Sequence, residues 1–488
     1  MYTHVLLRSF AFSLTPPKSP IPRHPPPRPL ATFRRFSDDP LVPDHTTGCW
    51  PDPSAMVANL TALGVKCAVS VWPDVSNASI NWKNMSSRGM LIRGEDGRPG
   101  RGLQGQFFVD AFNPATRKYQ FDQLMQGYGE YGIDTFWLDA TEPEGANIGN
   151  WYYKFDDGSI HHDTEVAMAW PQQYHRMVRE GLEKRAEKRV AASASASLVP
   201  PSTGPSAVSA VPPTTSTTST TAGNNAANDR LITPNDAPSE NDLTAIPPFL
   251  TRSAFAGSQR YGAILWSGDI ESSFAELSVQ VQVAQHVAMS GIYLWTTDIG
   301  GFRNGDLTDP VFKELIQRWF QFGAFCPIFR LHGDRGGPTD PDKCGAHDGH
   351  DGYGYNEAWS FGEEAYTSIS GTMALRDTLR PYVQTQLDLA SSEGTPVLRP
   401  MVFDFRDTDC ATAPEQYMFG PDWLVAPVTV YQAKSKKVYL PQLVGKDEAW
   451  VYHYNASFIV PNGGSGGGWV TVPTTNTSEF PLFHREHA

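Results

Sequence analysis

Long apolar segments and cysteine motifs are both absent from this sequence. No run of about 18 apolar residues occurs, so no segment is predicted to span a membrane. The five cysteines show no C-x-x-C spacing and therefore indicate neither a disulfide scaffold nor a zinc site. They are Cys49, Cys67, Cys326, Cys344 and Cys410. We expect neither a metal ion nor a cofactor.

Positive charge is also scarce, because 39 Lys and Arg face 52 Asp and Glu and leave a net charge of -13. This balance argues against nucleic acid or an anionic membrane as a partner. The first 48 residues lack the apolar core and the small-residue cleavage site of a secretory signal. The sequence leaves the compartment open, with secretion or an organelle as alternatives, and it does not indicate an oligomeric state.

Aromatic residues are abundant. With 13 Trp, 18 Tyr and 26 Phe among 488 residues, the chain can bury a large core and is long enough for two or three domains. Aromatic residues combined with acids, and few basic clusters, suit a neutral substrate such as a sugar.

Composition divides the chain into segments. A Pro/Arg-rich head at 1–48 is predicted to be disordered, and so is an Ala/Ser/Thr-rich insert at 190–248, because neither can bury enough apolar surface to fold. The β/α pattern fills 49–396 on both sides of the insert. From 397 to 488, short alternating strands separated by Gly and Pro predict a small all-β sandwich domain.

The region 49–396 alternates helices with short apolar strands, which predicts a (β/α)₈ barrel. Polar side chains follow the predicted strands, and in such a barrel the carboxyl ends of the strands form one face that carries the active site. These residues are Asp74, Asp139, Arg252, Asp269, Asp298 and His332. One shared cleft explains them together better than six separate loop residues.

Asp139 has two readings when it is taken alone. It ends the apolar stretch 133–138, and a carboxylate there needs hydrogen bonds or a catalytic role. Asp139 and Glu142 also have the spacing of a helix capping box. Asp269 has no such alternative, because Ser273, four residues later, is the predicted cap of the next helix.

Two isolated acids with an Arg and a His indicate carboxylate chemistry. Glycosidases need one ionised carboxylate at the anomeric carbon and one protonated carboxyl at the leaving oxygen. Arg252 would favour an ionised Asp139, and Trp266 would give Asp269 a less polar setting. Trp137, Trp266, Trp295 and Phe302 could stack on sugar faces, although each fits a core position equally well. Other barrel hydrolases remain alternatives at this point.

The sequence resembles glycoside hydrolase family 31, the retaining α-glucosidases and α-xylosidases. The resemblance runs from about residue 50 to the end, outside the insert. Its motifs are Trp50-Pro-Asp-Pro, Phe136-Trp-Leu-Asp139-Ala-Thr-Glu142-Pro, Thr251-Arg252-Ser253, Trp266-Ser-Gly-Asp269, Thr297-Asp298-Ile-Gly-Gly-Phe302, Arg330-Leu-His332-Gly, Leu379-Arg-Pro-Tyr382, Phe419-Gly-Pro-Asp-Trp-Leu-Val-Ala-Pro427 and Phe480-Pro-Leu-Phe-His-Arg-Glu486.

The resemblance implies roles for the strand-end residues. Asp139 would be the nucleophile and Asp269 the acid/base, with carboxyl groups about 5–5.5 Å apart. The implied residues that bind the sugar are Trp137, Arg252, Trp266, Asp298, Phe302 and His332. Glu142 would support the nucleophile. The implied activity is hydrolysis of terminal α-linked glucose or xylose from oligosaccharides by double displacement.

The sequence also departs from this family. Members carry a β-sandwich and two barrel strands ahead of the region that begins near residue 50, so the barrel is expected to be incomplete. An acidic sugar-binding residue of the second strand would have no counterpart here. A glycosyl transferase and a non-catalytic remnant that still binds glycans are therefore alternatives to the hydrolase.

Overall fold

The computed structural model describes residues 3–6, 52–100, 107–142, 150–197, 246–336, 355–445, 447–455, 459–461 and 467–487. The chain divides into two compact units, Met1–Val178 with Pro247–Ala488, and Arg179–Ile246. The disorder predicted for 1–48 and 190–248 falls mostly outside the described residues. Within the head, β1 (Thr3–Leu6) forms a strand.

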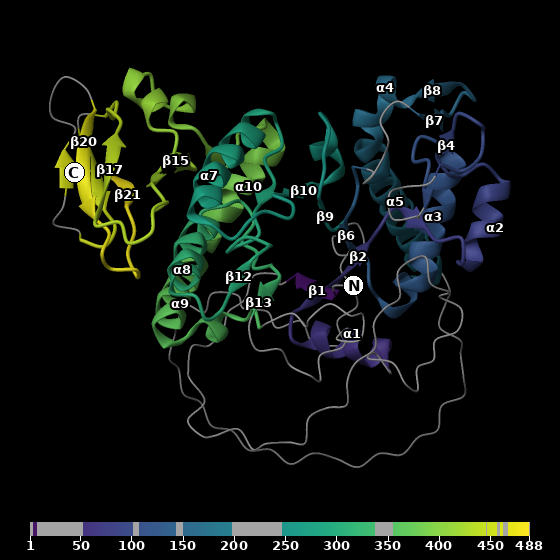
Figure 1. Cartoon of the computed structure of the whole chain (residues 1–488), viewed down its shortest axis with the longest axis horizontal. Helices are drawn as coiled ribbons and strands as arrows, with labels where there is room; N and C mark the ends of the chain where they lie inside the picture. The colour runs from purple at the N-terminus through teal and green to yellow at the C-terminus, as the bar shows by residue number, and fades with distance from the viewer. Residues whose placement is uncertain are drawn as a thin grey trace, which may run out of the picture. The chain divides into compact units, whose positions relative to one another are not determined.

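A mostly parallel six-stranded sheet, with the order β1-β2-β6-β9-β10-β11, carries the strand ends that were predicted to meet (Figure 1). Its other strands are β2 (Lys66–Val71), β6 (Thr135–Leu138), β9 (Phe249–Thr251), β10 (Ala263–Trp266) and β11 (Trp295–Thr296). Strands β2, β6, β9, β10 and β11 pair in parallel, whereas β1 pairs antiparallel with β2. All four residues of β6 are buried, as expected for a strand covered on both faces.

The apolar run at 325–329 predicts a strand by its composition, but the structure has none there. Helix α8 (Pro310–Ala324) occupies the chain up to Ala324, and Pro327 has no amide hydrogen to give to a ladder. Only the Ile328 amide reaches the sheet among the described residues of this segment, donating to the Trp295 carbonyl at 3.1 Å. The chain therefore passes the edge of β11 as an irregular segment.

The helices begin at recognisable capping residues. Asp52 accepts from the Ala55 amide at the start of α1. Ser273 accepts from the Glu276 amide at the start of α7 at 3.1 Å, which confirms the predicted cap. The helices are α1 (Pro53–Ala62), α2 (Ile80–Ser87), α3 (Pro114–Gly127), α4 (Asp163–Val166), α5 (Trp170–Ser197), α7 (Phe274–Met289), α8, α9 (Glu363–Thr378) and α10 (Arg380–Glu393).

The sequence predicts a helix that ends near Lys188, but α5 continues to Ser197, because the Ala-rich sequence that follows has high helix propensity. Single-turn 3₁₀ helices join the larger elements. They are η1 (Gly129–Tyr131), η2 (Ala167–Ala169), η3 (Ser258–Tyr261), η4 (Ala358–Phe361), η5 (Met401–Phe403) and η6 (Thr408–Thr412).

Short β-ladders form within the loops that connect the strands and helices of the β/α region. They are β3 (Asp74–Val75) with β5 (Phe107–Phe108), β4 (Arg93–Gly94) with β7 (Trp151–Lys154) and β8 (Ile160–His162), and β12 (Gly305–Asp306) with β13 (Arg335–Gly336). The last pair joins the loop after β11 to the loop that contains His332.

The C-terminal part is all-β, as predicted. Its six-stranded sheet has the order β14-β15-β16-β21-β18-β19, and β17 pairs with β20 in a second sheet (Figure 1). The strands are β14 (Leu398–Arg399), β15 (Tyr417–Phe419), β16 (Trp423–Val425), β17 (Ser435–Leu440), β18 (Glu448–Tyr452), β19 (Ile459–Pro461), β20 (Gly468–Pro473) and β21 (Leu482–His487). Met418 and Trp450 of one sheet share a buried cluster with Val438 and Val472 of the other, so the sheets pack face to face.

Arg376 of α9 fixes the chain as it leaves α8. Its guanidinium donates to the carbonyls of Ala324, Cys326 and Pro327 at 2.7, 3.0 and 2.9 Å. These carbonyls would otherwise be unpaired at a buried helix end. These three hydrogen bonds from Arg376 fix the start of the segment that leads to His332.

Candidate active site

Three of the predicted residues meet at one guanidinium. Nη1 of Arg252, which follows β9, lies 3.2 Å from Oδ1 of Asp139 and 3.9 Å from Oδ2 of Asp269. Asp139 follows β6 and Asp269 follows β10, on either side of β9 in the sheet. The two carboxylates therefore face a common point at the carboxyl ends of adjacent strands.

Asp139 is a buried carboxylate with a raised pKa. Its side chain is only 14% exposed, and burial raises its pKa to about 6. The charge of Arg252 and the Ala140 amide, which donates to Oδ1 at 2.8 Å, lower the pKa but do not cancel the effect of burial. Asp269 and Glu142 raise it further. Arg252 thus acts in the expected direction, and desolvation is the larger effect.

The capping-box reading of Asp139 does not hold in the described residues. Ala140 has φ 52°, in the left-handed region that a helix cannot continue through. Both carboxylate oxygens of Glu142 accept from Arg252, at 2.9 Å each, instead of reaching back to Asp139. Glu142 therefore fixes the guanidinium that the two other acids share.

Asp269 lies nearer to the solvent than Asp139. Its side chain is 34% exposed, and Nη2 of Arg303 lies 3.6 Å from its Oδ2. The apolar setting expected from Trp266 is thus replaced by two guanidinium groups. Arg303 was not predicted as a site residue, and no pattern in its surroundings singles it out.

Asp298, after β11, is fully buried and pairs with Arg330. Burial raises the pKa of Asp298 to about 6, against the lowering effect of Arg330. Its Oδ2 has no hydrogen-bond partner among the described residues, and neither does Nη2 of Arg330. Arg330 lies in a quoted motif and could have been identified from it, because a buried carboxylate needs a counter-charge.

Aromatic rings surround this ion pair. Trp137 meets Trp266 and His332 edge-on, with centroids 5.3 and 5.0 Å apart, and Phe302 stacks on His332 at 5.4 Å. The guanidinium of Arg330 lies 5.1 Å from the Trp137 ring. The structure therefore brings all the predicted sugar-binding residues into two connected groups, one around Arg252 and one around Arg330.

A buried polar network beneath Arg252 holds two of the loops together. The Thr141 hydroxyl lies 3.2 Å from that of Thr251 and 2.9 Å from that of Ser253. His175 of α5 contacts Thr251 through Nε2 at 2.8 Å, and burial lowers the pKa of His175 to about 3. A neutral imidazole can both donate and accept here. Sequence reasoning did not identify these residues.

Arg335 joins the loops after β11 and around His332. It donates to the carbonyls of Gly301 and Ile299 at 2.7 Å each and to that of His332 at 3.2 Å. Gly301 has φ +78°, and a Cβ there would lie 2.6 Å from the Glu271 carbonyl oxygen. Only glycine lets the loop after β11 approach the loop after β10 this closely.

Of the predicted strand-end residues, Asp74 takes a structural place. It opens β3 and pairs with Phe108 of β5. In the part of the chain that the structure describes, no cluster of three His, Cys, Asp or Glu side chains is suited to a metal ion. No described helix is both long enough and apolar enough to cross a membrane.

Two family models match the chain. That of the glycosyl hydrolases family 31 TIM-barrel domain matches residues 44–386, and that of the glycosyl hydrolase family 31 C-terminal domain matches 394–488. An α-xylosidase of Saccharolobus solfataricus is 30% identical over 445 residues, 90% of this chain and 47% of that protein. Alpha-xylosidase A of Aspergillus niger is 28% identical over 89% of this chain and 55% of its own length. The chain thus spans about half the length of these curated relatives.

Other matches are shorter or structural. Neutral α-glucosidase C of Mus musculus is 32% identical over 49% of this chain and 23% of its own length. The crystal structure of a GH31 α-xylosidase from a soil metagenome, complexed with xylose, superposes with a TM-score of 0.70. It is 34% identical and covers 91% of this chain and 56% of that chain.

Proposed function

The chain belongs to glycoside hydrolase family 31, and on that premise we propose that it is a retaining α-glycosidase with Asp139 as nucleophile and Asp269 as acid/base. The observation that carries these assignments is the contact of one Arg252 nitrogen with both carboxylates. A retaining mechanism needs two carboxyl groups about 5–5.5 Å apart across one sugar ring, and a nitrogen in contact with both acids keeps them near each other.

In the first step, Asp139 attacks the anomeric carbon while Asp269 gives its proton to the glycosidic oxygen. The bond between that carbon and oxygen breaks, and the alcohol leaves. In the second step, Asp269 takes a proton from water, whose oxygen attacks the same carbon and releases the Asp139 carboxylate. The sugar keeps its α configuration after two inversions.

The different exposure of the two acids supports this division of roles. Asp139 is the less exposed, and Arg252 and the Ala140 amide stabilise its charged form. A nucleophile must be ionised, so turnover should fall as the pH drops below about 6. Asp269, one third exposed, lies on the side where a leaving alcohol departs and water enters.

The second group of residues would hold the sugar. Asp298 Oδ2, Arg330 Nη2 and Trp266 Nε1 are buried polar atoms without partners among the described residues, and sugar hydroxyls would satisfy them. Trp137 and Phe302, both in contact with His332, offer the apolar faces on which a pyranose stacks. Buried polar atoms that lack a partner are costly, which favours a polar ligand.

We propose α-xylosides as the better substrates and α-glucosides as the weaker ones. Two curated relatives that match about nine tenths of this chain are named α-xylosidases, whereas the neutral α-glucosidase matches about half. The ratio of kcat/KM for an aryl α-xyloside and the matching α-glucoside tests this preference. Free sugar as the main product would distinguish hydrolysis from transfer.

Alanine variants and azide test the two carboxylates. Asp139→Ala should abolish turnover, and azide should restore formation of a β-glycosyl azide, because only one inversion occurs. Asp269→Ala should keep turnover of substrates with good leaving groups, and azide should then give the α-glycosyl azide. Asp388→Ala, on an exposed turn of α10, is the control. Wild-type rates in Asp139→Ala, or the opposite azide products, would exclude these roles.

A further inference from the structure

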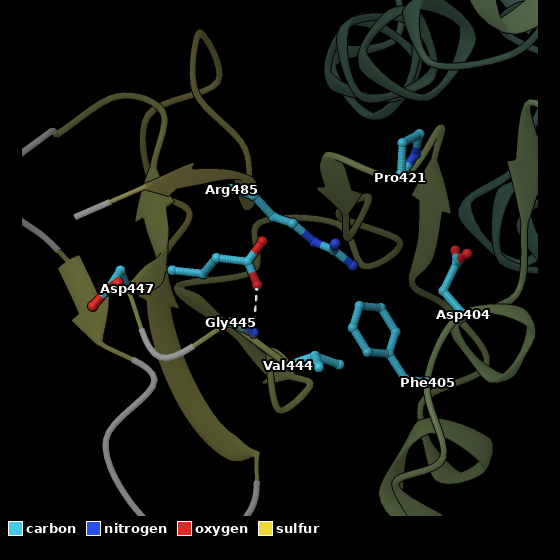
Figure 2. Close-up of a pocket in the computed structure, with 8 residues that line it drawn as sticks. Asp404, Phe405, Pro421, Val444, Gly445, Asp447 and Arg485 are labelled. Atoms are coloured by element: carbon cyan, nitrogen blue, oxygen red, sulfur yellow. Dashed lines mark hydrogen bonds between the residues drawn. The ribbon is translucent and has the colours of Figure 1, made fainter.

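The C-terminal β-domain contains a cavity of about 440 Å³ (Figure 2). This volume lies within the usual range of small-molecule sites, about 300–1,000 Å³. Apolar and charged side chains alternate around it. Its lining residues are Asp404, Phe405, Pro421, Val444, Gly445, Asp447, Glu448 and Arg485. All of them belong to the segment after the β/α region, so the cavity is separate from the site around Arg252.

Arg485 of β21 is the central polar group of this cavity. Figure 2 shows its guanidinium projecting between Phe405 and Pro421. The guanidinium carbon lies 5.1 Å from the Phe405 ring and 5.6 Å from the Trp450 ring, so two aromatics hold it in place. Its Nε is buried and has no hydrogen-bond partner among the described residues. A buried donor in this state favours a ligand that brings an acceptor.

The carboxylates around the cavity differ in how far they are already paired. Asp404 accepts from Arg399 at 2.7 and 3.0 Å, so its charge is compensated. Glu448 accepts from the Gly445 amide through Oε2 at 2.9 Å, shown as the dashed line in Figure 2. Its Oε1 can still accept a hydrogen bond from a ligand. Asp447 is exposed and forms no ion pair within the described residues. These two acids can each accept a hydrogen bond from a ligand.

The pattern of charges selects the chemistry of the ligand. Asp447 and Glu448 oppose a simple anion, and the guanidinium of Arg485 opposes a simple cation. A hydroxyl group both accepts from Arg485 and donates to the carboxylates. Phe405, Pro421 and the 97% exposed Val444 supply apolar surface for the carbon-bound hydrogens of a ring. A neutral saccharide meets all of these requirements at once.

We propose that this cavity is a second, non-catalytic saccharide site on the C-terminal β-domain. Arg485 and the acids Asp447 and Glu448 would bind hydroxyl groups, and Phe405 and Pro421 would contact the apolar face of the ring. The site would hold a glycan chain on the protein independently of the carboxylates around Arg252. It does not depend on the roles proposed for those carboxylates.

Hydrogen exchange with mass spectrometry tests this site, since it reports each region of the full chain separately. Maltotriose is the probe, and the Asp139→Ala chain is used so that the probe is not consumed. Maltotriose should slow exchange in the peptides 444–448 and 482–487, whatever happens in the peptides around Asp139 and Asp269. Betaine, a zwitterion without hydroxyls, should leave these peptides unchanged.

Variants of the lining define the interaction. Arg485→Met keeps the apolar stem over the aromatic rings and should weaken the affinity at these peptides by about tenfold or more, as when a hydrogen bond to a charged group is lost. Asp447 lies on an exposed loop, so Asp447→Asn should not affect folding. This substitution should weaken the affinity for maltotriose by roughly threefold to tenfold. Arg406→Met, exposed and outside the lining, is the matched control.

The proposal is refuted if maltotriose slows exchange only around Asp139 and Asp269. Unchanged affinity in both lining variants, or protection by betaine equal to that by maltotriose, would refute it as well. Activity retained by the Asp139→Ala chain, with intact protection at 444–448, would count against the catalytic proposal alone. The two sites are thus tested separately.

Discussion

Replacing Asp139 by Asn should stabilise the protein while it abolishes turnover. Burial raises the pKa of Asp139 to about 6, although Arg252 and the Ala140 amide oppose this. Against about 4 in an unfolded chain, this difference corresponds to on the order of 3 kcal/mol of destabilisation when the carboxylate is charged. Asn has the same shape, and its amide oxygen can still accept from Ala140, but it carries no charge.

The effect should depend on pH in a defined window. A carboxyl whose pKa is higher in the folded chain binds its proton more tightly when folded, so the folded state loses stability as the pH rises from about 4 to about 6. Above this window the Asn variant should be more stable by about 1–3 kcal/mol. The gain can be smaller than the full cost of the buried charge, because the variant loses the ion pair with Arg252. Below about pH 4 the two proteins should be equally stable.

Thermal unfolding followed by calorimetry between about pH 4 and pH 8 measures this window. The thermal midpoint of Asp139→Asn should exceed that of the wild type by a few degrees at high pH, and the difference should vanish at low pH. Asp388→Asn, at an exposed helix position, should give no such trend. A variant that is less stable than the wild type at pH 8 would refute the argument that desolvation outweighs Arg252.

Two further predictions concern the loops that carry the site. Gly301→Ala should lower the thermal midpoint and the activity, because φ is +78° and the new Cβ would lie 2.6 Å from the Glu271 oxygen; an unchanged midpoint would contradict the close approach. Arg330→Met leaves Asp298 buried without its counter-charge and should cost about 3–5 kcal/mol in urea unfolding at neutral pH. Without Arg330 the pKa of Asp298 rises above its wild-type value of about 6, so the cost should be smallest near pH 6, where the carboxyl of the variant is protonated, and should grow as the pH rises; a pH-independent cost would exclude this cause.

The five parallel strands β2, β6, β9, β10 and β11 could be predicted because they are largely buried and read as short apolar runs, whereas β1 lies in a segment predicted to be disordered. The same signal failed at 325–329, since a buried irregular segment after a helix can have the same composition as a buried strand. Helix α8 itself is absent from the predicted elements, although Asp309 followed by Pro310 is a recognisable start. Hydrophobic periodicity and composition distinguish a buried strand from the segment after a helix only when the end of that helix is known.

The site could be predicted in its acids and in Arg252, but not in its other arginines. A polar residue after an apolar run is visible along the chain, and Asp139, Asp269 and Asp298 all follow strands. Their partners Arg303 and Arg330 lie in loops, and their contacts depend on how the loops fold over the sheet. Sequence reasoning also assigned Asp269 an apolar setting, because it could not see that two guanidinium groups approach it.

The balance of charge around Arg252 bears on the proposed chemistry more than any single pair. Asp139, Asp269 and Glu142 all contact this one guanidinium, so even when Asp269 holds its proton, Asp139 and Glu142 place two negative charges around the single positive charge of Arg252. A glycosidic bond breaks through a transition state with positive charge near the anomeric carbon. Surplus carboxylate charge fixed beside that carbon favours the transition state over the neutral substrate. Burial is the main reason why the pKa of Asp139 stays raised beside an arginine, and the two other acids that share that cation add a smaller increase.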